Sequence, residues 1–92
     1  MQRAMTREEM LVILIEEAGE VIQAATKCLR FGWDRDWPDY GINHEVLAKE
    51  VGDMIGAADA LALREDIVAE FRRMKMTKVE RWKDYAASHP ST

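Results

Sequence analysis

A nine-residue pattern that occurs twice constrains this chain more than any other feature. Residues 17–25 read EAGEVIQAA, and residues 50–58 read EVGDMIGAA. Each copy begins with two acidic residues three positions apart, and positions i and i+3 of a helix share a face. Two copies are too few for a solenoid, which needs at least three repeats. The repeat therefore predicts two antiparallel helices that carry their acidic residues at matching positions.

The helix that contains the first copy has sequence signals at both ends. Thr6 and Glu9 have the spacing of a capping box, in which each side chain bonds the backbone N–H of the other residue. The helix is expected to run to about Arg30, where Gly32 provides a stop signal.

The rest of the chain is interpreted as a connection and two further helices. Residues 31–42 contain glycine, proline and several aromatic residues without period-two alternation, so no strand is expected there. Asn43 is a suitable N-cap for a second helix that runs to about Arg64. A third helix is expected from residue 65 or 66 to about residue 86.

These elements predict an all-α fold, with an antiparallel helix pair plus a C-terminal helix. Residues 1–92 are expected to form a single domain with an ordered core over residues 6–86. A chain of this length buries only a modest core. We therefore expect oligomerisation, as a homodimer or homotetramer, to complete the small helical bundle.

Composition narrows the class of protein. Hydrophobic residues make up 48% of the chain and charged residues 33%, which is typical of a soluble globular protein. The net charge of −4 argues against a general nucleic-acid binder. No apolar run is long enough to span a membrane. A single cysteine, Cys28, excludes an intrachain disulfide and fits a cytoplasmic location.

The acidic residues of the repeat lie on the apolar side of their helices. Glu17 and Glu50 are each flanked one turn away by aliphatic residues. A buried carboxylate without a partner costs several kcal/mol, so it needs a basic partner or a metal. Lys27 and Lys49 lie off the apolar stripe, which favours a metal. Hard oxygen ligands favour Mg²⁺, with Mn²⁺ as a substitute. The predicted metal ligands are Glu17, Glu20, Glu50 and Asp53, and Glu16 is a fifth acid beside them.

Two further groups are candidates for substrate binding. Residues 72–83 are strongly basic, and Lys75, Lys78 and Arg81 are candidates for phosphate contacts, although a solvated helix end has the same composition. Three aromatic residues of the connection are candidates for stacking a nucleobase, or else form a lid over the core or a subunit contact, and they are Trp33, Trp37 and Tyr40. Asn43 is a candidate for reading a base edge, unless it acts only as an N-cap.

The acidic pattern resembles a known family signature. Residues 16–20 (EEAGE) and 50–53 (EVGD) resemble the E-E-x-x-E … E-x-x-D signature of the MazG-like all-α nucleoside triphosphate pyrophosphohydrolases. Relatives in that superfamily include dimeric dUTPases, dCTP pyrophosphatases and phosphoribosyl-ATP pyrophosphohydrolase. The resemblance covers roughly residues 8–82. It implies a helical bundle, obligate dimers or tetramers, and magnesium-dependent cleavage between the α and β phosphates.

The resemblance also implies roles for matching positions. Glu17, Glu20, Glu50 and Asp53 would be metal ligands. Glu16 would be a further ligand, a group behind the ligands, or the base that orients the attacking water. The resemblance further implies that the basic positions Lys75, Lys78 and Arg81 contact phosphates.

The expected function is therefore magnesium-dependent hydrolysis of a (deoxy)nucleoside triphosphate to the monophosphate and pyrophosphate. Three alternatives stay open. The chain could hydrolyse phosphoribosyl-ATP. It could be a metal-stabilised helical interaction protein without catalysis. It could also be a helical dimerisation module whose carboxylates pair with basic residues of a partner chain.

Overall fold

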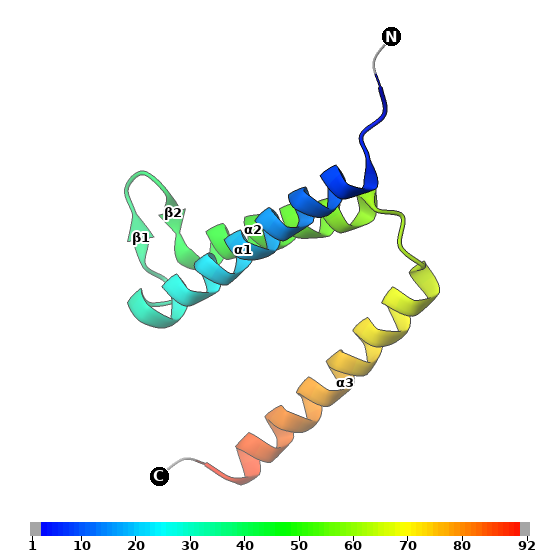
Figure 1. Cartoon of the computed structure of the whole chain (residues 1–92). Coiled ribbons are helices and arrows are strands. Elements are labelled where there is room, and N and C mark those ends of the chain that lie inside the picture. Colours follow the sequence, from blue (N-terminus) through cyan, green and yellow to red (C-terminus); the bar gives the residue numbers. More distant parts are fainter. Residues whose placement is uncertain (1–2, 91–92) are drawn as a thin grey trace. The chain divides into compact units, whose positions relative to one another are not determined.

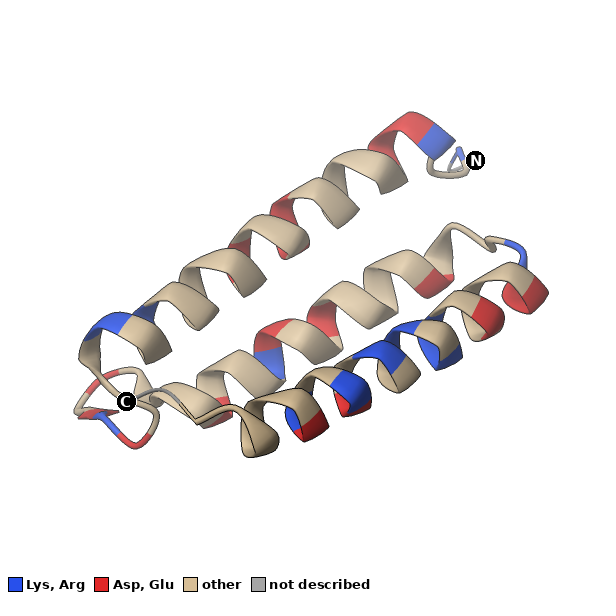
Figure 2. Cartoon of the chain, turned by 90° about the horizontal axis from the view of Figure 1, so that it is seen from below, with Lys and Arg blue, Asp and Glu red and all other residues tan. Residues whose placement is uncertain are grey.

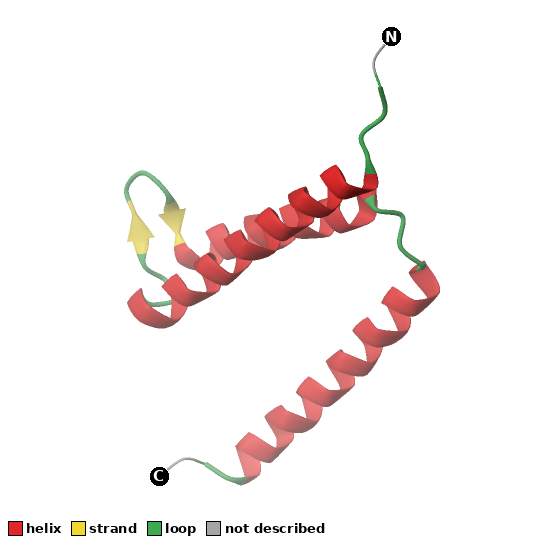
Figure 3. Cartoon of the chain, in the orientation of Figure 1, coloured by secondary structure: helices red, strands yellow, loops and turns green. Residues whose placement is uncertain are grey.

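The computed structural model describes residues 3–90 and is mostly helical, as predicted (Figures 1 and 3). Along the chain it contains α1 (Arg7–Phe31), β1 (Asp36–Trp37), β2 (Gly41–Ile42), α2 (Asn43–Ala60) and α3 (Glu65–Ser88). The contacts divide the described residues into two units, one that ends at Ala62 and one that begins at Leu63. The first unit holds α1, the strands and α2, and the second holds α3.

The predicted capping box opens α1. The backbone N–H of Glu9 donates to Thr6 Oγ1 at 3.1 Å, and the backbone N–H of Thr6 donates to Glu9 Oε1 at 3.0 Å. Arg3 pairs with the same carboxylate, and these bonds lower the pKa of Glu9 to about 2. The helix ends at Phe31, one residue later than expected, and Gly32 follows with a φ of +109°.

The expectation that residues 31–42 contain no strand was wrong. Two strands of two residues each pair antiparallel, with Asp36 opposite Ile42 and Trp37 opposite Gly41. The backbone N–H of Tyr40 donates to Trp37 O at 3.0 Å and closes the turn between them. Strands this short cannot show period-two alternation, which is why the sequence pattern did not reveal them.

The expectation that Asn43 is the N-cap of the second helix was also wrong. Ile42 holds that position and makes no side-chain capping bond. Asn43 is the first residue of α2, and its backbone N–H donates to Arg35 O at 2.9 Å. The next N–H, of His44, donates to Trp33 O at 3.1 Å. Carbonyls of the preceding loop thus satisfy two of the N–H groups that a helix leaves open at its start.

The side chain of Asn43 joins three segments of the first unit. It is 3% exposed, and its Oδ1 accepts a bond from Trp37 Nε1 at 2.8 Å. Its Nδ2 donates to Gly32 O at 2.8 Å and to Lys27 O at 3.3 Å. One amide therefore holds the end of α1, the hairpin and the start of α2 together.

Helices α1 and α2 pack against each other and run antiparallel, as predicted (Figures 1 and 2). Ala24 is the one apolar residue among residues 3–90 that is buried. A Cβ built on Gly19 or Gly52 would meet nothing within 4 Å, so the space beside both glycines is open within this chain.

The second predicted helix is shorter than expected. It ends at Ala60 rather than about Arg64, and Ala62 adopts a left-handed φ of +51°. A left-handed alanine interrupts the helix without the glycine or proline that would mark the break in the sequence. The start of α3 at Glu65 agrees with the prediction, and the helix ends two residues later than expected.

We predict that Asn43→Ala destabilises the fold by about 2–4 kcal/mol, because it leaves buried donors and acceptors of three segments without partners. Urea denaturation followed by circular dichroism measures this change. The control is Gln23→Ala, which removes an exposed amide of α1 and should change stability by less than about 0.5 kcal/mol. Equal stabilities of the two variants would contradict the role given to Asn43.

Candidate metal site and adjoining pocket

Three carboxylates meet where α1 and α2 pack together. Glu17 of α1 and Glu50 and Asp53 of α2 each offer an oxygen atom, and these atoms all lie within 4.8 Å of one another. Glu17 and Glu50 are partly buried, whereas Asp53 is exposed. The i, i+3 spacing puts Glu50 and Asp53 on one face of α2, and the antiparallel packing brings Glu17 opposite them. We call these three residues the acid cluster.

The other two acidic residues of the predicted site lie outside the acid cluster. Glu16 and Glu20 are exposed on α1. The charge of Glu20 still acts on Glu17, because it contributes to the raised pKa of that carboxyl. Roles for Glu16 and Glu20 remain predictions.

The surroundings of Glu17 raise its pKa above the ordinary carboxyl value. Loss of solvent is the largest cause, followed by the negative charges of Asp53 and Glu50, while the charge of Lys49 acts in the opposite direction. The charged form of Glu17 is therefore disfavoured in the folded chain. A divalent cation at the acid cluster would remove that penalty.

The sequence interpretation gave no role to Lys49, which in the structure is a direct partner of the acid cluster. Its Nζ lies 3.0 Å from Asp53 Oδ2 and 3.3 Å from Glu50 Oε1. These contacts raise the pKa of Lys49. The i, i+4 spacing between Lys49 and Asp53 is a sequence signal that could have identified this ion pair. Lys49 thus neutralises part of the negative charge of the acid cluster from within the same chain.

The acid cluster fits a hard divalent cation. Its donors are all carboxylate oxygens, the type that Mg²⁺ and Mn²⁺ prefer, and few carboxylates suffice because Mg²⁺ keeps several waters. Lys49 supplies one positive charge against three carboxylates, so a negative charge is left over. The residues present can therefore hold Mg²⁺ or Mn²⁺.

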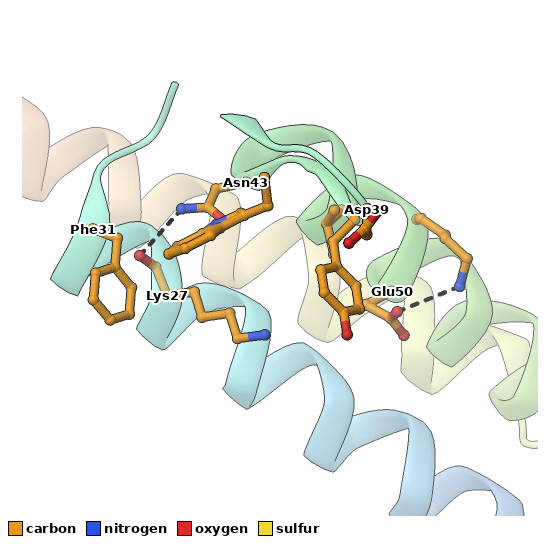
Figure 4. Close-up of a pocket in the computed structure, with 9 residues that line it drawn as sticks. Lys27, Phe31, Asp39, Asn43 and Glu50 are labelled. Atoms are coloured by element: carbon orange, nitrogen blue, oxygen red, sulfur yellow. Dashed lines mark hydrogen bonds and ion pairs between the residues drawn. The ribbon is translucent and has the colours of Figure 1, made fainter. Parts of the chain in front are cut away.

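A pocket of about 520 Å³ adjoins the acid cluster (Figure 4). It opens between α1, the hairpin and the first turns of α2. Glu50 and Lys49 belong to both the pocket wall and the group of charges at the acid cluster. The other lining residues are Lys27, Phe31, Trp37, Asp39, Tyr40, Asn43 and Val46. A ligand in this pocket would thus touch the acid cluster.

The aromatic candidates have different surroundings. Trp37 lines the pocket and packs edge-on against Phe31, with ring centroids 5.4 Å apart. Trp33 stacks on His44 at 5.4 Å and is not among the lining residues. Asn43 lines the pocket, but both atoms of its amide are engaged within the chain. Asn43 is therefore suited to positioning Trp37 rather than to reading a base.

The predicted phosphate contacts belong to α3. Lysine and arginine residues recur along this helix, which leads to the C-terminus (Figure 2). Lys75 Nζ lies 5.3 Å from the ring centroid of Trp82 on the same helix, and Lys78 and Arg81 are exposed. Because α3 forms the second unit, their contact with phosphates remains a prediction.

Comparisons with protein-family models, with curated proteins and with solved structures found no match. Of the helices described, none combines the length and the apolar character needed to cross a membrane.

We predict that Glu17→Gln raises the melting temperature at pH 7 when divalent ions are absent. The raised pKa means that the folded chain holds this proton more strongly than the unfolded chain. The contribution of Glu17 to the free energy of unfolding is therefore fully present below the ordinary carboxyl pKa. It is lost as the pH rises through the raised pKa of the folded chain. The variant should also show a smaller fall in melting temperature between pH 4.5 and 7.

Differential scanning fluorimetry with EDTA and with MgCl₂ measures both effects. Wild type should gain melting temperature on addition of Mg²⁺, and Glu17→Gln should gain less. The control Glu70→Gln changes an exposed acid of α3 and should behave as wild type. A lower melting temperature for Glu17→Gln than for wild type in EDTA at pH 7 would contradict the prediction.

Proposed function

We propose that this protein is a magnesium-dependent nucleoside triphosphate pyrophosphohydrolase that acts as a homo-oligomer. It would convert a (deoxy)nucleoside triphosphate to the monophosphate and pyrophosphate. The observation that carries the proposal is the position of Glu50, which belongs to both the acid cluster and the wall of an aromatic pocket. A ligand with a flat ring and a polyanionic chain, joined in one molecule, suits such a pair of neighbouring sites.

The charge balance of the acid cluster supports a need for metal. Three carboxylates near one Lys49 ammonium leave a net negative charge, which repels a polyphosphate. In the proposal Glu17, Glu50 and Asp53 hold Mg²⁺. When bound, this ion neutralises the phosphate oxygens. The ammonium of Lys49, released from Glu50 and Asp53, would then be free to contact the substrate.

The proposed reaction is a displacement at the α-phosphorus. Water supplies the oxygen that bonds to this phosphorus, and the bond to the oxygen bridging to the β-phosphorus breaks. Pyrophosphate leaves with the electron pair, and a carboxylate accepts the proton of the water. Glu16 is the candidate for that base, and Lys75, Lys78 and Arg81 are candidates for holding pyrophosphate.

The exposed face of α1 supports self-association. Val12, Ile15, Ile22 and Leu29 recur at helical spacing along one side of this helix, and all are more than half exposed. Gly19 falls on the same line, with open space beside it. Contiguous apolar patches of this kind mark interaction surfaces. A second copy of the chain is the proposed partner.

One observation favours a second candidate. Lys49 neutralises part of the negative charge of the acid cluster from within the chain. A helical module with a purely structural role requires such a basic partner, because it holds no metal ion. In that case neither Mg²⁺ nor nucleotides would raise the melting temperature. A metal-stabilised interaction protein would respond to Mg²⁺ alone, so thermal shifts separate the three possibilities.

We predict that Glu50→Gln abolishes turnover, because it removes a carboxylate shared by the acid cluster and the pocket. Pyrophosphate release is measured with a panel of NTPs and dNTPs, in MgCl₂ and in EDTA. Wild type should be active with Mg²⁺ only, and Glu50→Gln should lose at least about a hundredfold in kcat/KM. Helix content should be unchanged by circular dichroism.

The matched control for this experiment is Glu45→Gln, an exposed carboxylate of the same helix. It should retain wild-type turnover. Full activity of Glu50→Gln, or no release from any substrate by folded wild type, would reject the proposed function.

We predict that Ile22→Glu weakens self-association, because it puts a charge on the exposed apolar face of α1. Sedimentation velocity should give an oligomer for wild type and a smaller species for the variant. Gln23→Glu adds the same charge beside this face and should leave the oligomer intact. A monomeric wild type would contradict self-association.

A further inference from the structure

We propose that the pocket beside the acid cluster selects a guanine base, which Asp39 and Lys27 recognise. The inference extends the proposed function by naming the base of its substrate. It also predicts binding of guanine nucleotides in the absence of metal and turnover, so the two proposals can fail separately.

The size and walls of the pocket suit a flat heteroaromatic ring. Its volume of about 520 Å³ lies within the ~300–1,000 Å³ range of small-molecule sites. Phe31, Trp37 and Tyr40 supply aromatic surface, on which bases stack in a sequence-tolerant way. Stacking alone therefore accounts for binding a base but not for choosing one.

The wall formed by Trp37 is held in place on several sides. Its indole N–H donates to Asn43, and its ring packs edge-on against Phe31. The guanidinium of Arg35 lies over the same ring, 4.4 Å from its centroid. Because the ring of Trp37 is already held in one position, ligand binding does not have to order it, and the entropic cost of binding is lower. A shallow surface depression lined by mobile side chains lacks this advantage.

Three polar side-chain groups of the pocket make no hydrogen bond within residues 3–90, and they are the carboxylate of Asp39, the ammonium of Lys27 and the hydroxyl of Tyr40. Asn43 uses its whole amide within the chain, and Lys49 and Glu50 bond each other beside the acid cluster. Within residues 3–90 the carboxylate of Asp39 and the ammonium of Lys27 have no ion-pair partner, and the ammonium lies 5.8 Å from the ring centroid of Tyr40. Figure 4 shows Lys27 on α1 and Asp39 on the hairpin, on the two sides of the opening.

A carboxylate and an ammonium that line one pocket from two sides match one base edge best. Guanine presents two adjacent donors, N1–H and the amino group at C2, followed by the acceptor O6. The two oxygens of Asp39 accept from both donors, and the Lys27 ammonium donates to O6. Adenine and cytosine place an acceptor nitrogen beside their amino group, and uracil and thymine flank their N–H with carbonyls. Each of these arrangements puts an acceptor against the carboxylate.

The first measurement is binding of nucleoside monophosphates without metal, followed by amide chemical shifts in NMR titrations. GMP should bind at least about fivefold more tightly than IMP, which lacks the amino group at C2. It should also bind more tightly than AMP, CMP and UMP, and should shift amides of the hairpin and of the start of α2. Equal affinities, or no binding of GMP at millimolar concentration, would overturn the inference.

The second measurement is a change of specificity. In Asp39→Asn the amide offers one acceptor and one donor, which match N1–H and the C2 carbonyl of xanthine. The variant should therefore prefer XMP to GMP, a reversal that general damage to the hairpin cannot produce. Asp36→Asn removes the same charge from the same hairpin outside the pocket and should keep the preference for GMP. An unchanged preference in Asp39→Asn would overturn the inference.

Hydrolysis data then separate the two proposals. Selective binding of GMP without pyrophosphate release from GTP leaves the guanine site standing and rejects the proposed function. Pyrophosphate release at equal kcat/KM from all four common triphosphates supports the proposed function and overturns the guanine site.

Discussion

The first unit of this protein depends on the side-chain amide of Asn43. Its three hydrogen bonds reach the end of α1, the backbone after it and the indole of the hairpin. Apolar burial contributes little to holding these segments together, since Ala24 is the one buried apolar residue of residues 3–90. A buried and fully bonded polar group specifies a unique arrangement where packing alone leaves several. The relative positions of the aromatic wall and of the two acidic helices follow from that amide.

The acid cluster and the pocket are consequences of the same packing. Antiparallel helices bring Glu17 opposite Glu50 and Asp53, and the hairpin and the end of α1 supply the aromatic wall beside the first turns of α2. Glu50 lies on the boundary between charged and aromatic surroundings. Because the two environments share a residue, they are neighbours on one continuous surface, which is the basis for proposing a nucleotide as the occupant.

The sequence predicted those features that depend on helical periodicity. The repeated acidic spacing placed Glu17, Glu50 and Asp53 on facing sides of two helices, and the capping box fixed the start of α1. The sequence did not predict features that depend on a few individual contacts or backbone conformations rather than on a repeated pattern. The hairpin strands are too short to alternate, and the left-handed Ala62 ends its helix without a breaker. Asn43 was interpreted by its local preference for capping, whereas its bonds to residues 11 and 16 positions away decide its role.

The contact of Lys49 with the acid cluster has a consequence for the metal binding that we propose. A cation tethered to the chain is always at high local concentration, so a mobile ion must displace it to bind. A monovalent ion brings no more charge than the ammonium that it replaces, whereas a divalent ion brings twice as much. For the metal ion that we propose, the tethered ammonium would thus favour a divalent over a monovalent ion at this position.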